Sequence, residues 1–300
     1  MGFFKSFIPQ ETYEEKVFKG ERPLFGAVGV KLQNCVFEDG ESPLKESKDI
    51  ELYGSMFRWK YPLWYCDNVL MENGAWLDGG RAGAWYSRNI DIRNTLIQAP
   101  KTFRRSERIM LENVSITNAA ETFWNCSDIK LKNVTAAGDY FAMNSENIEA
   151  EELDLDGKYA FDGVKNVTVR NSRLVTKDAF WNSENVTVFD SYISSEYLGW
   201  NSVDLTFVNC TIESLQGLCY IDGLKLVNCR LLDTTLAFEY TNVDADITGG
   251  IGSVFNPGKG RIKAARIGEL IMEDNEIDPA DTVIECDDVA VRSDKPEWKR

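Results

Sequence analysis

The chain has 300 residues, 43% of them hydrophobic, which is enough apolar material for a sizeable core. Its formal net charge is −15. A surface this acidic repels phosphate groups, so we expect neither nucleic acid nor an anionic membrane as a partner. Histidine is absent. This excludes Ser–His and Cys–His nucleophiles, an imidazole base and histidine metal ligands.

The first residues and the cysteines indicate the compartment. Residues 1–9 include no long apolar run and no small-residue cleavage site, so we expect no signal peptide. No apolar stretch is long enough for a transmembrane helix. The seven cysteines are an odd number, and Cys35, Cys210 and Cys229 share one repeat position typical of small buried hydrophobic residues. We therefore expect a reducing, cytoplasmic location.

A motif with a period near 19 residues runs through most of the chain. Each repeat begins with an apolar residue, here called the anchor, and a second apolar residue follows two positions later. Up to Leu224 the anchors lie 19 to 21 residues apart, and they are Val30, Ile50, Val69, Ile90, Ile109, Ile129, Ile148, Val167, Val186, Leu205 and Leu224. Beyond Leu224 the phase weakens, and the expected anchors are Ala245, Leu270 and Val289.

This repeat predicts an all-β fold, a single-stranded right-handed parallel β-helix. The period is too short for paired-helix repeats, and Val, Ile and Thr dominate the anchor segment, which favours strands. An asparagine stands four residues after most anchors, at Asn34, Asn73, Asn94, Asn113, Asn133, Asn171, Asn209 and Asn228. Asparagine tolerates the left-handed turn conformation, and its amide can bond from coil to coil. We expect residues 1–27 to form an N-terminal cap and residues 28–300 the β-helix, irregular after about residue 240.

A second strand is expected before each anchor. Six residues upstream lies a mostly apolar column that includes Phe103, Phe123, Phe161 and Phe180. Because strand side chains alternate, the residue after each of these should face outward. The outward column contains Trp64, Trp85, Arg104, Trp124, Met143, Asp162, Trp181, Trp200 and Cys219.

Several segments resemble an uncharacterised bacterial family, domain of unknown function 3737. They include Gly20-Glu21-Arg22-Pro23-Leu24-Phe25-Gly26, Ala99-Pro100-Lys101-Thr102-Phe103-Arg104-Arg105-Ser106, Asp178-Ala179-Phe180-Trp181-Asn182 and Glu196-Tyr197-Leu198-Gly199-Trp200-Asn201-Ser202. The resemblance covers nearly the whole chain and implies a pectin-lyase-like β-helix, but no activity. Arg261-Ile262-Lys263 looks like a substrate-binding tripeptide of polygalacturonases, whose histidine motif cannot exist here.

The outward tryptophans are the best functional clue, because exposed rows of aromatic side chains often mark a binding groove. The predicted ligand-binding residues are Trp64, Trp85, Arg81, Lys101, Arg104, Arg105, Trp124, Trp181 and Trp200. Arginine and lysine in this set would recognise carboxylates, so an acidic oligosaccharide is the expected partner. The alternative is a non-catalytic scaffold, in which the tryptophans stack on each other and Lys101 pairs with Glu121 of the next coil.

Glu121, Asp162 and Asp178 are the candidate catalytic carboxylates. Glycosidases place two carboxyl groups roughly 5 to 9.5 Å apart. Strand spacing puts Glu121 about 14 Å from Asp178, and Asp162 about 11 Å from Asp178. Neither pair fits well, so whether the protein is an enzyme stays open, as does its oligomeric state. We expect no metal and no cofactor. Residues 152–163 begin like a calcium-binding loop but lack its final glutamate, so we interpret them as a turn.

Overall fold

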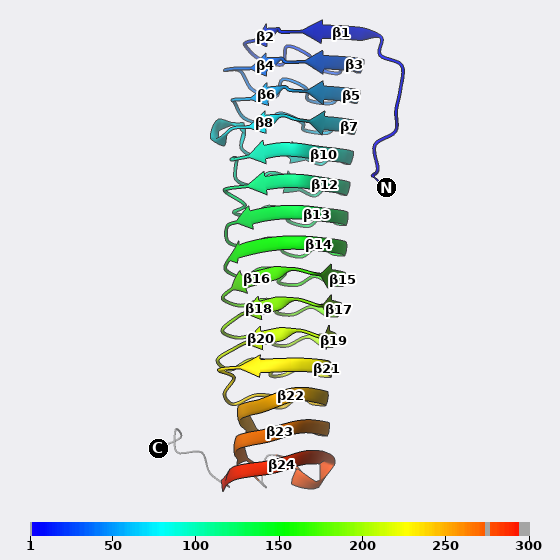
Figure 1. Ribbon diagram of the computed structural model, residues 1–300. Helices are drawn as coiled ribbons and strands as arrows, with labels where there is room; N and C mark the ends of the chain where they lie inside the picture. The colour runs from blue at the N-terminus through cyan, green and yellow to red at the C-terminus, as the bar shows by residue number, and fades with distance from the viewer. Residues whose placement is uncertain (1, 274–276, 294–300) are drawn as a thin grey trace. The chain divides into compact units, whose positions relative to one another are not determined.

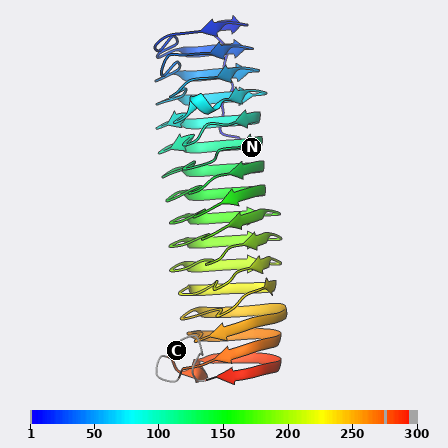
Figure 2. The same ribbon diagram turned by 90° about the vertical axis from the view of Figure 1, so that its left-hand side faces the viewer.

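The structure, a computed structural model, describes residues 2–273 and 277–293. The chain divides into two compact units, residues 1–157 and residues 158–300. Each unit is a right-handed parallel β-helix whose strands pair in parallel with those of the next coil (Figure 1 and Figure 2). Among the described residues there is no helix with the length and apolar character that crossing a membrane requires.

The first unit consists of short strands in its early coils and longer strands later. Its elements are β1 (Glu11–Glu14), β2 (Val17–Phe18), β3 (Val28–Gln33), β4 (Val36–Phe37), β5 (Lys48–Tyr53), β6 (Met56–Phe57), β7 (Asp67–Glu72), β8 (Ala75–Trp76), the 3-10 helix η1 (Asp78–Gly80), β9 (Ala84–Trp85), β10 (Arg88–Ile97), β11 (Phe103–Arg104), β12 (Glu107–Ile116), β13 (Ser127–Ala137) and β14 (Glu146–Gly157).

The second unit follows the same plan and ends in three long strands. Its elements are β15 (Lys165–Arg170), β16 (Arg173–Thr176), β17 (Glu184–Phe189), β18 (Tyr192–Ser194), β19 (Val203–Val208), β20 (Thr211–Glu213), β21 (Asp222–Leu232), β22 (Asn242–Phe255), β23 (Lys259–Ile271), the 3-10 helix η2 (Pro279–Asp281) and β24 (Thr282–Ser293).

The anchors form the core of each unit, as the repeat predicts. In the first unit Ile109 pairs with Ile90 on one side and Ile129 on the other, and all three are buried. In the second unit Val186 pairs in the same way with Val167 and Leu205. Each coil therefore places its branched apolar side chain directly against that of the next coil, which removes both from water.

The predicted anchors beyond Leu224 are wrong. Leu224 pairs with Val243 rather than Ala245, Val243 pairs with Gly260, and Gly260 pairs with Thr282. The register shifts between Leu226 and Cys229 and again between Ile247 and Gly250. Glycine and threonine at the anchor position, together with these two irregularities, remove the apolar signal on which the sequence pattern depended.

The predicted asparagines occupy left-handed corners and join adjacent coils. All eight have φ between 47° and 55°. In the first unit the Asn113 amide donates to Asn94 Oδ1 at 3.0 Å and accepts from Asn133 Nδ2 at 2.9 Å. In the second unit Asn228 donates to Asn209 at 2.9 Å. The ladder therefore satisfies polar side chains at the positions where the chain turns.

A column of small residues just before the anchor strand adds a second ladder. Ser87 Oγ accepts from the Cys66 N–H at 2.9 Å, and Ser106 Oγ accepts from the Ser87 N–H at 3.0 Å. Cys126 continues the column and is buried, as are Cys35, Cys210 and Cys229 at their own shared position. Burial raises the pKa of the Cys66 thiol and of the Cys126 thiol to about 12, because an apolar surrounding disfavours the thiolate.

Strand pairing begins before the expected end of the cap at residue 27. β1 pairs with β3 through Glu11 and Val30, and β2 pairs with β4. Residues 11–18 are therefore already part of a coil, although Glu11 occupies the position at which later coils have an apolar anchor. Residues 2–10 form no strand and run alongside the first unit to about the level of β12 (Figure 1).

Candidate functional site

In the first unit the predicted tryptophan column occupies successive coils just before the anchor strands. β9 and β11 pair so that Arg104 lies beside Trp85, and a further parallel bridge joins Arg104 to Trp124. The residues before them in the chain, Ala84, Phe103 and Phe123, are completely buried. The tryptophans face outward, as alternation requires, but their side chains are half-buried.

The indole rings lie face to face with one another. The Trp64 and Trp85 rings have centroids 5.2 Å apart and an interplanar angle of 9°. Each indole N–H donates to a main-chain carbonyl of the next coil: Trp64 to Ala82 at 2.6 Å, and Trp85 to Lys101 at 2.8 Å. Where rings stack on each other in this way, their edges rather than their faces remain for a ligand. The ring faces contribute to joining the coils.

Arg104 takes the place of an indole in this stack. Its guanidinium carbon lies 4.6 Å from the Trp85 centroid and 4.6 Å from the Trp124 centroid. Its Nη2 donates to Glu121 Oε2 at 2.9 Å. A guanidinium between two aromatic faces is attracted by the quadrupoles of both rings, and its desolvation costs little free energy because it is only weakly hydrated. Arg104 is therefore one member of the stack, in contrast to its predicted role as a ligand-binding residue.

Glu121 is neutralised from both sides. Lys101 Nζ lies 3.0 Å from Glu121 Oε1, which is the coil-to-coil ion pair considered from the sequence, and Arg104 takes the other oxygen. A carboxylate whose two oxygens are each engaged by a cation has no free oxygen with which to attack a substrate or a water molecule. The predicted catalytic role of Glu121 therefore has no support from its surroundings.

A second outward column, one residue later in each coil, is more exposed. Tyr65 and Tyr86 are 48% and 38% exposed, and their rings stack with centroids 4.9 Å apart at 7°. The Arg105 guanidinium carbon lies 6.0 Å from the Tyr86 centroid. Arg105 and Arg81 are exposed, and neither forms an ion pair with any described residue. This column is visible in the sequence, but the ligand-binding prediction was based on the larger tryptophans beside it.

The second unit repeats the stacked arrangement. The Trp181 and Trp200 centroids lie 5.7 Å apart at 8°, and both side chains are half-buried. The Trp200 indole donates to the Gln216 carbonyl at 3.1 Å. Asp162, a predicted catalytic residue, accepts from Asn182 Nδ2 at 3.0 Å. These tryptophans join coils as Trp64 and Trp85 do.

Asp178 has the least ordinary surroundings of the three predicted catalytic carboxylates. It is 3% exposed, and its Oδ1 has no hydrogen-bond partner among the described residues. Desolvation raises the pKa of Asp178 above its usual range, Lys177 opposes that rise, and Glu196 adds to it. A raised pKa favours the protonated acid, but a side chain this buried cannot reach a substrate without movement of the chain around it.

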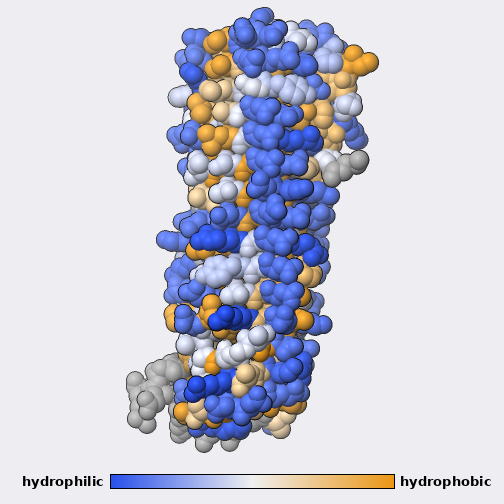
Figure 3. Space-filling model, in the orientation of Figure 1, coloured by the Kyte–Doolittle hydropathy of each residue, from blue (hydrophilic) through white to orange (hydrophobic). Residues whose placement is uncertain are grey.

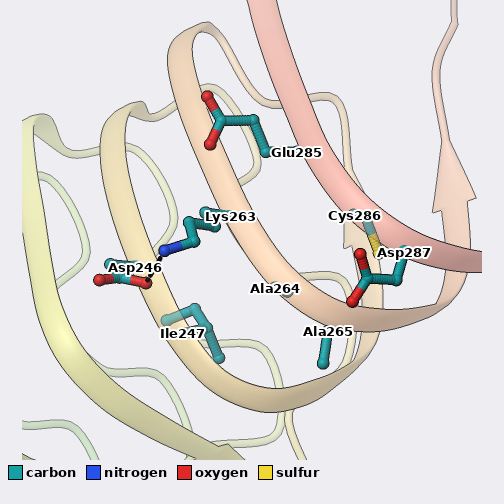
Figure 4. A pocket seen from close by; sticks show the side chains of 8 residues that line it. All are labelled: Asp246, Ile247, Lys263, Ala264, Ala265, Glu285, Cys286 and Asp287. Carbon is teal, nitrogen blue, oxygen red and sulfur yellow. Dashed lines mark ion pairs between the residues drawn. The ribbon is translucent and has the colours of Figure 1, made fainter.

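A hollow of about 490 Å³ lies on the outer face of β22, β23 and β24 (Figure 4). Lys263 Nζ lies 3.4 Å from Asp246 Oδ1 within it. Arg261 pairs with Asp244 at 2.9 Å and with Glu285 at 3.4 Å. The cations of the Arg261-Ile262-Lys263 tripeptide are thus matched by carboxylates of neighbouring strands. No group of three or more Cys, Asp or Glu side chains is placed to hold a metal ion within the part of the chain that is described.

Comparison with known proteins identifies a family. A family model described as protein of unknown function (DUF3737) matches residues 11–285. No curated protein matches the chain.

Among solved structures, the A-module of mannuronan C-5 epimerase AlgE4 from Azotobacter vinelandii is 10% identical. The match covers 94% of this chain and 86% of that one, with a TM-score of 0.34. The surface protein and adhesin PfbA of Streptococcus pneumoniae is 9% identical over 97% and 81% of the two chains, with a TM-score of 0.28. Identities this low transfer no activity.

Proposed function

We propose a function from the geometry of the first unit, because the chain belongs to the DUF3737 family of proteins of unknown function. The proposed function is binding of an elongated, carboxylate-bearing ligand such as an acidic oligosaccharide. The observation that carries the proposal is the column of Tyr65, Tyr86 and Arg105. Two stacked, exposed tyrosines are continued in the next coil by an exposed arginine that no carboxylate neutralises among the described residues.

The chemistry of this column fits such a ligand. Tyrosine offers an apolar ring edge together with a hydroxyl that donates and accepts hydrogen bonds, as sugar hydroxyls require. Arginine binds a carboxylate through two parallel N–H bonds. In a chain of net charge −15, Arg81 and Arg105 are exposed cations without an ion pair among the described residues, and such cations would attract an anion.

Spacing supports an extended ligand rather than a compact one. Residues of one column recur in each coil, so tyrosine hydroxyls and guanidinium groups follow each other at about 4.8 Å, the distance between paired strands. A polymer of sugar residues can meet several rungs of such a column at once, and the contacts add as linked binding events.

We propose binding without hydrolysis. Glu121, the predicted catalytic carboxylate of this unit, is engaged on one oxygen by Lys101 and on the other by Arg104. The half-buried tryptophans hold the turns that present the tyrosine column, because their N–H groups bond the carbonyls of Ala82 and Lys101.

The test is a binding titration of the full chain by isothermal calorimetry, using oligomers of a uronic acid and matched neutral oligomers. The uronic oligomers should bind, and their affinity should fall as salt is raised, because the contact is ionic and exposed. Arg105→Ala should weaken binding at least tenfold with little change in the unfolding midpoint. Arg170→Ala is the matched control, because Arg170 is also exposed and lies over an aromatic ring, Phe189, in the second unit.

Two results would count against the proposal. Equal affinity for neutral and uronic oligomers would remove the role of the arginines. Absence of binding to either class would favour the alternative, in which both aromatic columns serve only the stability of a scaffold.

A further inference from the structure

The N-terminal segment is held by two side chains on the outer face of β7 and β10. Asp91 Oδ1 accepts hydrogen bonds from the Phe3 N–H at 2.8 Å and from the Phe4 N–H at 3.1 Å. The Asn68 amide accepts from the Lys5 N–H at 2.7 Å and donates to the Lys5 carbonyl at 2.8 Å. Both side chains therefore bind main-chain groups of an extended segment.

Asp91 and Asn68 point outward, yet both are buried. Asp91 lies between the core residues Ile90 and Ile92 and is 1% exposed, while Asn68 is 6% exposed. Two further outward residues in the same cross-strand row as Asp91, Leu70 and Met110, are 6% and 8% exposed. Figure 1 shows the N-terminal segment running along this edge of the first unit, and Figure 3 shows hydrophobic side chains among the hydrophilic ones there.

The two side chains are fixed by bonds to the β-helix itself. Arg93 Nη2 donates to Asp91 Oδ2 at 3.0 Å, which leaves Oδ1 for the segment. Asn68 Nδ2 also donates to Asp49 Oδ1 at 2.7 Å, which fixes the orientation of the amide. A site whose groups are held before the ligand arrives loses little side-chain entropy when it binds.

We propose that this face of β7, β10 and β12 is a binding site for an extended peptide, filled here by residues 3–5 of the same chain and able to take that sequence as a separate molecule. Within the described residues, the bonds from Asp91 and Asn68 are the hydrogen bonds that hold Phe3, Phe4 and Lys5 main-chain groups, and the segment joins no sheet. Such a segment can leave and return without disturbing a strand.

The site also selects sequence. A Cβ on Gly2 would lie 1.8 Å from Asp91 Oδ2, so only glycine fits at that position while Asp91 keeps its place. Lys130 Nζ lies 5.6 Å from the centroid of the Phe3 ring. The ligand class is therefore an extended peptide in which glycine is followed by an aromatic residue.

The experiment uses the full chain and a fluorescein-labelled synthetic peptide with the sequence of residues 2–9, with binding followed by fluorescence polarisation. Gly2→Val should expel the chain's own segment, so the peptide should bind this variant at least tenfold more tightly than the parent. Adding Asp91→Leu to Gly2→Val should remove that gain. Ser6→Val is the matched control, because Ser6 is exposed in the same segment and should leave the site filled.

Hydrogen exchange provides a second measurement on the same proteins. In the parent, the Phe3, Phe4 and Lys5 amides should exchange more slowly than the Ser6 amide, and in Gly2→Val all four should exchange alike. Equal peptide affinity for parent and Gly2→Val would overturn the proposal. So would undiminished affinity after Asp91→Leu, or protection of Phe3 and Phe4 that survives Gly2→Val.

Discussion

Arg104 lies over Trp85, with its guanidinium carbon 4.6 Å from the ring centroid, and so fills the rung that an indole fills in the coil before it. Trp124 closes the other face of the cation at the same distance. The arginine is thus part of the structure that holds the turns together. The proposed ligand is therefore expected to contact the exposed Arg81 and Arg105 instead.

Replacing Arg104 should cost stability. Two cation–aromatic contacts at about 0.5–2 kcal/mol each predict a loss of about 1–4 kcal/mol in the free energy of unfolding for Arg104→Ala. Arg104→Trp should lose less, because an indole continues the stack. Urea denaturation measures both. An Arg104→Ala variant as stable as the parent would show that the stack does not contribute to stability. Arg170→Ala, which removes one aromatic contact, gives the free-energy loss expected for a single contact of this kind.

Substitutions of Asn113 separate the contributions of the amide hydrogen bonds and of the left-handed backbone conformation to stability. Asn113 has φ 55° and bonds both Asn94 and Asn133. Asn113→Ala loses the amide ladder and strains a left-handed residue, at about 1–2 kcal/mol for the strain and about 1 kcal/mol for the bonds. Asn113→Gly loses only the bonds, so it should be the more stable variant by denaturant midpoint. The reverse order would mean that the backbone conformation does not limit this corner.

Val167 tests the anchor stack. Its side chain is 2% exposed and pairs with Val186. Val167→Asp buries a charge without a partner and should destabilise by about 4 kcal/mol or more, enough to unfold part of the population. Thr168→Asp is the matched control, since Thr168 is the outward neighbour and pairs with Thr187. Circular dichroism melting of the two variants should differ widely, and similar melting would contradict the inward assignment.

Asp178 predicts a pH dependence with a definite sign. Desolvation raises its pKa in the folded protein, so the folded state binds the proton more tightly than the unfolded state. Stability from this group is present below the unfolded pKa and is lost as pH rises through the folded pKa. Asp178→Asn keeps the shape without the charge, so it should be more stable than the parent at pH 7, with a smaller advantage at pH 3. If the stability advantage of Asp178→Asn over the parent grew toward acid pH, the inferred direction of the Asp178 pKa shift would be wrong.

The fold could be predicted because its signal is repeated. A single Val-x-Val proves little, but Val167, Val186 and Leu205 at constant spacing specify both strand direction and register. The same reasoning failed after Leu224, where Gly260 occupies the anchor position and carries no side chain to show it.

The site was harder, because alternation fixes only where a Cβ points. It placed Trp85 outside the core but could not show that the ring turns back to bond the Lys101 carbonyl. The contact between Phe3 and Asp91 spans 88 positions of the chain. Its one local sign was the apolar pair Leu70 and Met110 at outward positions beside Asp91, which indicates that something covers that face.

The corner asparagines also limit how the gene for such a protein can change length. Asn209 bonds Asn228 because the two stand 19 residues apart, as do the anchors Leu205 and Leu224. Duplication or loss of one complete repeat brings every corner, core and serine position back into line with a neighbour. An insertion of one or two residues at a turn misaligns only that coil, whereas the same change inside an anchor strand turns its core side chains outward. Families built this way are therefore expected to vary in whole repeats and at their turns.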